Sequence, residues 1–122
     1  MTKQTILMAG PYRSRTDDNA AKMERNLRTL EEHALEVYRR GHLPLIGEWV
    51  ALPLMSIAGS KRIGDEVYEE FAYPVASRLI DLCDGVLRIE GESTGADEDV
   101  RKALERGIPV YRSLSEVPDA RG

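Results

Sequence analysis

Acidic residues gather in one short stretch of the chain, after a segment with the composition of a buried strand. Asp97, Glu98 and Asp99 follow the apolar run Gly85–Ile89, and Asp84 precedes that run. One carboxylate can attack an anomeric carbon and form a glycosyl-enzyme intermediate, while a second acid assists the leaving group. The helix dipole alone also favours acids in a first helical turn. The stretch therefore indicates either catalysis or a stabilised helix start.

Two other segments carry groups that could hold the remainder of a ligand. After the first apolar run, glycine allows close backbone approach and the following side chains offer donors to phosphate or sugar oxygens: Gly10, Pro11, Tyr12, Arg13 and Ser14. Just before the acids, small and hydroxyl residues could hold an anion against a helix start: Ser93, Gly95 and Ala96. The first segment matches neither the Walker loop nor the GxGxxG fingerprint, and taken alone it could be a turn with solvated arginines.

Three other residue types deserve a prediction. Trp49 lies beside Glu48 in a stretch that is hard to assign, and it could pack in the core or stack on a base. His33 and His42 lack the HxH or HExxH spacing of metal ligands, so we expect no metal and no other cofactor. Cys83 is expected to be a small buried residue.

Short apolar runs alternate with helical patterns along the chain. Four runs predict strands, at residues 4–9, 42–46, 85–89 and 108–111. Helices are expected after the capping residues Asp17–Asn19, from Asp65, and over Asp97–Arg106. This alternation predicts an α/β fold with one doubly wound parallel sheet of four to five strands and helices on both faces, flavodoxin-like or Rossmann-like. Both ligand-holding segments would then leave the same edge of the sheet, where ligands bind.

The remaining segments give weaker signals. Residues 47–64 are expected to be a long irregular excursion with one turn of helix, and loops of that length are usually functional or mobile. Pro74 should kink or break the helix that begins at Asp65. Ser113–Val117 predicts a final helical turn, and the tail 118–122 is expected to be frayed.

Composition limits the class of protein. The 122 residues fit one domain, and a net charge of −4 predicts no affinity for nucleic acid or for an anionic membrane. The single cysteine excludes an internal disulfide and fits a reducing compartment, so we expect a cytoplasmic protein. No apolar run approaches the about 20 residues that span a bilayer, and no signal peptide is expected.

Three motifs resemble the nucleoside 2-deoxyribosyltransferase-like superfamily, most closely its small branch with nucleotide N-glycosidases and uncharacterised domains. They are Met8-Ala9-Gly10-Pro11-Tyr12, the run from Ser93 to Ala103, and Gly107-Ile108-Pro109-Val110. In that group an AGP-type first loop is paired with S-x-G-x-x-x-E-x-x-x-A and a closing G-x-P-V strand. The resemblance in element order covers nearly the whole chain and implies one such domain over residues 1–122.

The resemblance also implies roles for individual residues. Tyr12 and the backbone of Gly10–Arg13 would hold the sugar or its phosphate, and Ser93 and Gly95 would bind the 5′ end. Asp84 falls near a family position where an aspartate lies close to the base.

The family's catalytic glutamate falls on Asp99, which is one methylene shorter. Glu98 has the right chemistry but lies one position earlier, about 100° round the helix. We favour Asp99, because Val100, Ala103 and Leu104 are predicted to form the buried face and so fix the register. A shift that brings Glu98 inward, or a loss of catalysis, are the alternatives.

The leading hypothesis is an enzyme that cleaves the N-glycosidic bond of a nucleoside 5′-monophosphate or nucleoside, by hydrolysis or by transfer to another base. A non-catalytic nucleotide-binding module on the same fold is the main alternative. A phosphoribohydrolase ranks lower because its PGGxGTxxE run is missing, and a receiver domain lower still because Ala9-Gly10-Pro11 replaces its acid pair. The resemblance implies a homodimer or higher homo-oligomer, and apolar residues of the excursion could form its interface: Trp49, Val50, Leu52, Leu54 and Met55.

Overall fold

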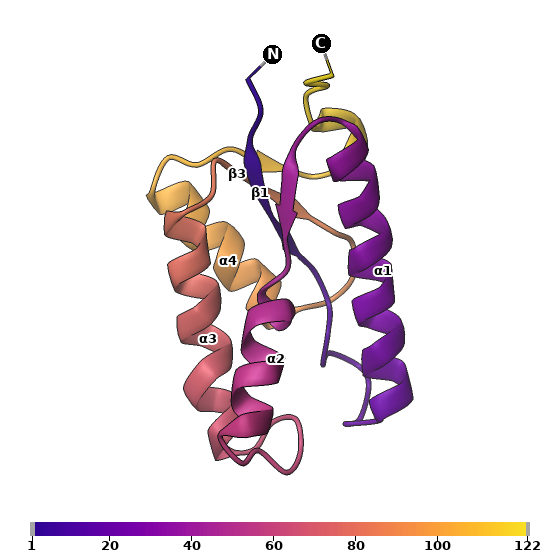
Figure 1. The fold of residues 1–122 in the computed structure, drawn as a ribbon, viewed down its shortest axis with the longest axis vertical. Helices are drawn as coiled ribbons and strands as arrows, with labels where there is room; N and C mark the ends of the chain where they lie inside the picture. The colour runs from indigo at the N-terminus through magenta and orange to yellow at the C-terminus, as the bar shows by residue number, and fades with distance from the viewer. Residues whose placement is uncertain (1, 122) are drawn as a thin grey trace.

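A computed structural model describes residues 2–121 and centres on a four-stranded sheet (Figure 1). The strands are β1 (Thr5–Ala9), β2 (Leu43–Leu45), β3 (Gly85–Arg88) and β4 (Val110–Tyr111). Their order is β2-β1-β3-β4, and every neighbouring pair is parallel. The predicted parallel α/β architecture is therefore confirmed.

Helices cover both faces of this sheet. Alternate strand residues point to opposite faces, so each face has its own core. On one face Ile6 and Met8 pack with three residues of α1 (Ala20–Arg39): Leu30, Ala34 and Val37. On the other, Leu7 and Ala9 pack with residues of α3 (Glu66–Asp81) and α4 (Thr94–Glu105): Ile80, Ala96 and Ala103. The remaining helix, α2 (Gly47–Ile57), follows β2 and lies beside α3 (Figure 1).

The strand order creates a crevice between β1 and β3. The chain leaves β1 through α1 toward β2 on one side, and leaves β3 through α4 toward β4 on the other. The loops that follow β1 and β3 therefore run in opposite directions from this point, beyond the carboxyl ends of the strands. In doubly wound sheets this switch point is where ligands bind.

The prediction for residues 47–64 was wrong, because Gly47–Ile57 forms three turns of helix and not one. Pro53 lies inside α2 and Pro74 inside α3, and neither ends its helix. A proline removes one backbone donor and frees the carbonyl four residues earlier. Both prolines lie at exposed positions of their helices. The proposed break at Pro74 is thus not observed.

Helix α4 begins three residues earlier than expected, at Thr94 and not at Asp97. The Ser93 hydroxyl oxygen accepts a hydrogen bond from the Ala96 amide at 3.0 Å and caps the helix. Asp97 alone among the three acids then lies in the first turn, so the dipole does not account for Asp99. The buried face consists of Ala96, Val100 and Ala103, whereas Leu104 is 61% exposed, which corrects its predicted burial.

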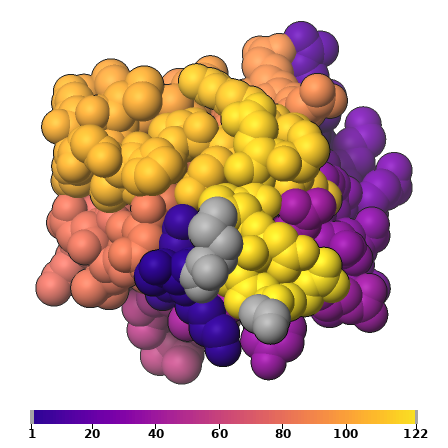
Figure 2. Space-filling view, turned by 90° about the horizontal axis from the view of Figure 1, so that it is seen from above, coloured from indigo at the N-terminus to yellow at the C-terminus, as the bar shows by residue number. Residues whose placement is uncertain are grey.

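Residues 118–120 of the tail that was expected to fray are held down, and residue 122 lies outside the described residues. The Ala120 amide donates to the Arg40 carbonyl at 2.7 Å, and His42 Nε2 lies 2.6 Å from the Pro118 carbonyl oxygen. The final 3-10 turn, Leu114–Glu116, precedes this segment as predicted. Seen from the side of the strands' amino ends, the C-terminal segment lies beside the first residues of the chain (Figure 2). Within residues 2–121, no helix has the length and apolar character to cross a membrane.

Candidate functional site

A cavity of about 370 Å³ lies at the carboxyl ends of the central strands. Its walls come from the end of β1, the β1–α1 loop, α2, α3 and the start of α4. Eight of the residues singled out in the sequence line it: Gly10, Tyr12, Arg13, Ser14, Ser93, Gly95, Ala96 and Asp99. The two ligand-holding segments and one acid are therefore brought together at the switch point.

The start of α4 presents both backbone and side-chain groups to this cavity. Ser93 is buried at the cap position, and Gly95 follows in the first turn. A Cβ added at Gly95 would meet nothing within 4 Å, so the space beside Gly95 is open. Free backbone N–H groups of a first turn attract anions. Asp99, one turn further along, extends the same wall.

Asp99 shares the cavity with a second carboxyl group, that of Glu48 in the first turn of α2. Burial and the nearby Glu48 raise the pKa of Asp99 to about 7, against the opposing effect of Lys102. Burial also raises the pKa of Glu48, partly offset by a hydrogen bond from its own backbone amide. Two carboxyls with raised pKa values in one cavity can exchange roles as acid and base near neutral pH.

Sequence reasoning missed Glu48 as a functional residue. It stands right after β2, whose end lies at the same sheet edge as those of β1 and β3. Its position after a strand was the available signal. Using that signal required recognising Gly47–Ile57 as a helix and not as an irregular loop.

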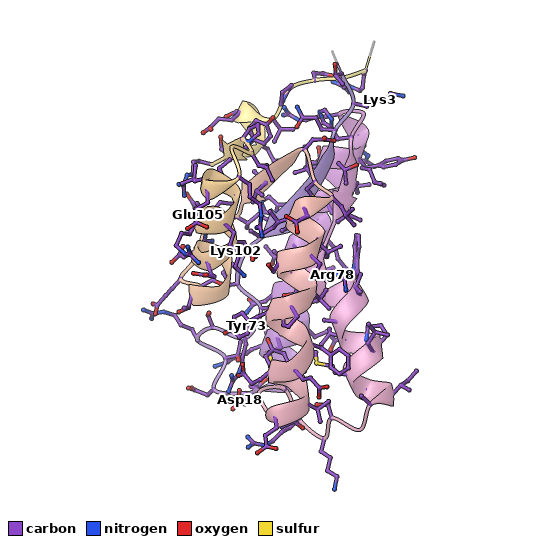
Figure 3. All side chains as sticks on the ribbon, turned by 90° about the vertical axis from the view of Figure 1, so that its left-hand side faces the viewer. Lys3, Asp18, Tyr73, Arg78, Lys102 and Glu105 are labelled. Atoms are coloured by element: carbon purple, nitrogen blue, oxygen red, sulfur yellow. The ribbon has the colours of Figure 1, made fainter. Side chains whose placement is uncertain are left out.

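Aromatic side chains form the other wall of the cavity. Burial, Glu48 and Glu24 raise the pKa of Tyr12, and burial with Glu48 raises that of Tyr68 to about 12. Both phenols are therefore neutral hydrogen-bond donors at physiological pH. Tyr73 of α3 also lines the cavity and lies close to the start of α4 (Figure 3).

Arg13 crosses from the β1–α1 loop toward α3. Its Nε donates to Asp18 Oδ1 at 2.9 Å, and its guanidinium carbon lies 6.0 Å from the centre of the Tyr68 ring. A Cβ at Gly64 would clash with this guanidinium, and Gly64 has a φ of +94°. Glycine there lets the arginine reach across to the α2–α3 turn. Arg13 therefore lines the cavity while its Nε is already engaged by Asp18.

Four predicted site residues do not line the cavity. Glu98 points away from it and pairs with Arg101, which lowers the pKa of Glu98. Asp84 lies at the opposite edge of the sheet, where its Oδ2 accepts the Thr5 amide at 2.9 Å. The Trp49 indole donates to Glu31 Oε2 of α1 at 2.9 Å, and Pro11 packs against Gly91. Asp99 and Glu98 are adjacent in sequence, but their side chains point in different directions around α4, and of the two only Asp99 lines the cavity.

Comparison of the chain with protein-family models, with curated proteins and with solved structures gave no match. Function must therefore be inferred from the cavity. Among residues 2–121 there is no group of three or more His, Cys, Asp or Glu side chains that could hold a metal ion. The cavity instead combines two carboxyls, neutral phenols and an open helix start. These groups suit proton transfer and nucleophilic attack on a polar, anionic ligand.

Proposed function

We propose that the protein cleaves the N-glycosidic bond of a nucleoside 5′-monophosphate or nucleoside, by hydrolysis or by transfer to another base. The observation that carries this proposal is the pair Asp99 and Glu48, two carboxyls from different helices in one cavity at the switch point. Enzymes that cleave glycosidic bonds use such a pair, one group as nucleophile or base and the other as acid. The resemblance of the chain's motifs to nucleotide N-glycosidases points to the same chemistry.

The reaction needs one carboxylate and one carboxylic acid. The Asp99 carboxylate attacks the anomeric carbon, and the electron pair of the C–N bond passes to the departing nitrogen. Glu48 gives its proton to the base, which leaves neutral. Positive charge developing at the anomeric carbon favours the ionised form of the nearer carboxyl, so the proton of the pair resides on Glu48 at this stage. Glu48 then takes a proton from the water or incoming base that attacks the ester and frees Asp99.

The remaining cavity groups suit the sugar and its phosphate. The start of α4, with Ser93 and Gly95, offers backbone N–H groups to a 5′-phosphate. Ser14 and the unengaged donors of Arg13 lie on the facing loop and can share that charge. The phenol of Tyr12, neutral because of its raised pKa, can donate to a sugar hydroxyl. These groups favour a 5′-monophosphate over a free nucleoside.

The test is release of free base from a panel of nucleosides and 5′-monophosphates, followed by chromatography with the wild-type protein and two α4 variants. Asp99→Asn should reduce base release by about 100-fold or more, because it removes the attacking carboxylate. Glu98→Gln is the matched control and should leave base release within about twofold, since its side chain lies outside the cavity.

Three results would count against the proposal. Wild-type protein that releases no base from any substrate at high enzyme concentration would refute catalysis. If the same protein were stabilised by a nucleotide and Asp99→Ala still bound it, the fold would serve as a nucleotide-binding module. The shorter side chain of Asp99, at a position where the family that the motifs resemble carries glutamate, is the feature that favours this second candidate. Equal loss of activity in Asp99→Asn and Glu98→Gln would instead contradict the assigned site.

A further inference from the structure

Arg88 is the last residue of β3, and it is not one of the residues that line the cavity. It pairs in register with Ala9 at the end of β1, so its backbone stands at the switch point. Its side chain is only 12% exposed. A charged group so far removed from water needs partners within the protein, and these partners indicate what the side chain does.

The Arg88 guanidinium is bound on three sides. Its Nη2 donates to the Gly91 carbonyl oxygen at 2.9 Å and to Asp97 Oδ1 at 3.0 Å. Its Nη1 donates to the carbonyl oxygen of Ile89. Its Nε also donates to Asp97 Oδ1, at 3.3 Å. One side chain thus connects the end of β3, the β3–α4 loop and the first turn of α4.

The loop that Arg88 holds also contacts the loop that follows β1. Gly91 has a φ of +123°, and a Cβ there would lie 2.6 Å from Pro11 Cγ, so the position requires glycine. At the next residue, Glu92 Oε2 accepts a hydrogen bond from Arg15 Nε at 2.7 Å. Because these contacts join the two loops, a movement of the β3–α4 loop would displace the β1–α1 loop as well.

The cavity groups of α4 lie directly beyond this anchored loop. They are Ser93, Gly95 and Asp99. Asp97, which Arg88 binds, lies between the last two in sequence but does not line the cavity. The helix start is therefore held through a side chain that a ligand would not touch. A misplacement of about 1 Å in a reacting group can cost about 100-fold in rate, so such anchoring matters to catalysis.

We propose that Arg88 is a positioning residue of the candidate site: its guanidinium fixes the β3–α4 loop and the start of α4, and so sets where Ser93, Gly95 and Asp99 meet the substrate. This role rests on the proposed function. Arginine suits it better than lysine, because a planar guanidinium donates in several fixed directions at once, whereas an ammonium is a compact point charge on a flexible stem.

The positive charge of Arg88 supports the same reaction. Burial and Glu48 raise the pKa of Asp99 to about 7, with a smaller contribution from Glu98, while Lys102 and Arg88 oppose the rise. The other titratable side chains of the cavity are three phenols and one guanidinium: Tyr12, Tyr68, Tyr73 and Arg13. Loss of the Arg88 charge should therefore raise the pKa of Asp99 further and leave less of the attacking carboxylate ionised at neutral pH.

Amide hydrogen exchange tests the anchoring without any substrate. The amides of Ala96 and Asp97 are hydrogen-bonded to Ser93 at the start of α4. Arg88→Lys keeps the charge but cannot reach all three partners together, so these two amides should exchange about 10-fold faster than in the wild-type protein. Circular dichroism checks that the variant is folded. Unchanged exchange would overturn the proposal.

Arg101→Lys is the matched control. Arg101 is an exposed arginine of α4 that pairs with Glu98 and Glu105 on the helix surface. The same substitution there should leave the exchange of the helix start within about twofold, because exposed ion pairs contribute little. Equal acceleration in Arg88→Lys and Arg101→Lys would overturn the proposal, since any arginine of this region would then have the same effect.

Base-release kinetics test the consequence for the substrate. Arg88→Lys should raise KM for a nucleoside 5′-monophosphate by about 10-fold and leave KM for the nucleoside within about twofold, because the nucleoside has no phosphate to meet the start of α4. Arg88→Gln also removes the charge, so it should move the acid limb of kcat/KM to higher pH by about half a unit, which Arg88→Lys should not do.

A merely structural arginine would give a different pattern. Equal changes in KM for both substrates, or the same acid limb in the wild-type protein and Arg88→Gln, would overturn the positioning role. If the wild-type protein released no base from any substrate, the proposed function would fail by itself. The exchange rates of Ala96 and Asp97 would still decide whether Arg88 holds the start of α4, so the two failures are distinguishable.

Discussion

The sheet has an amino edge and a carboxyl edge, where its strands begin and end. Both carry buried or partly buried polar residues, but those residues have different roles. At the amino edge, Asp84 accepts the Thr5 amide, and His42 accepts the Gln4 amide at Nδ1 while its Nε2 lies against the Pro118 carbonyl. Each of these groups is matched to backbone and ties strands or the C-terminal segment together. At the carboxyl edge, Asp99 and Glu48 share a cavity in which the only backbone partner of Glu48 is its own amide, and the pKa values of both carboxyls rise.

This contrast separates polar groups that hold the fold from polar groups that are available to a ligand. A buried polar group without a strong partner lowers stability, and proteins keep such groups mainly at functional sites. Asp84 was a plausible catalytic residue in the sequence, but its partner is a backbone amide. Asp99 was one acid among three, but it shares its cavity with another carboxyl, that of Glu48.

The strongest test of this contrast is substitution of Glu48, for which we expect the largest loss of activity. Glu48→Gln should lower base release by about 100-fold or more, because it removes the proton donor of the pair. It should also lower the pKa of Asp99, since the charge of Glu48 helps to raise it. Base release as a function of pH and an NMR titration of the Asp99 carboxyl measure the two effects. An unchanged Asp99 titration would show that the two groups do not interact.

A second test concerns the loss of folding stability that the ionised Asp99 carboxylate causes. Its pKa is raised to about 7 from 3.8, so the folded state binds a proton more tightly than the unfolded state does. The free energy of unfolding should therefore fall as the pH rises from about 4 to 7. Asp99→Asn should remove this dependence and stabilise the protein at pH 8 by about 2 to 4 kcal/mol. Urea unfolding at pH 5 and pH 8 measures it, and equal stabilisation at both pH values would contradict the cause given.

A substitution at the amino edge should lower stability and leave activity unchanged. Asp84→Ala leaves the Thr5 amide without its side-chain acceptor, which should lower the free energy of unfolding by about 1 kcal/mol. Base release should remain at the wild-type level, because Asp84 lies across the sheet from the cavity. Thermal unfolding and the base-release assay of the same variant provide the comparison. A fall in activity without a fall in stability would return Asp84 to the site.

The smallest effect is expected at an ion pair on the surface of α4. Glu98 pairs with Arg101 in an exposed i,i+3 arrangement. Glu98→Gln should change the free energy of unfolding by about 0.5 kcal/mol or less, because exposed pairs contribute little. Denaturant unfolding at low and high salt checks this value. A larger change that disappears in high salt would indicate that the pair supports the start of α4.

Much of the architecture followed from local patterns. The strands at β1 and β3 and the helix α1 with its Asn19 cap were all predicted. Period and capping chemistry are encoded by neighbouring residues, so the sequence reveals them directly. Because parallel strands end on one edge, the meeting of Gly10, Ser93 and Asp99 was also predictable before any coordinates.

Other features depended on contacts between distant segments. Helix α2 was hidden by its glycine, its internal proline and an apolar composition without period, and its packing beside α3 made it a helix. The C-terminal segment was expected to fray, yet His42 and Arg40 hold it in place. The residues around His42, Arg40 and the C-terminal segment form no local sequence pattern that would indicate these contacts.

The sequence by itself indicated the α/β order and the end of the sheet at which Gly10, Ser93 and Asp99 line the cavity. Only the tertiary structure decided that Glu48 joins Asp99 and that Asp84 and Trp49 lie elsewhere. The physical reason is that periodicity fixes which face of an element is buried. The pKa of a carboxyl depends instead on which charges and how much water surround it, and those surroundings are assembled from residues far apart in the chain.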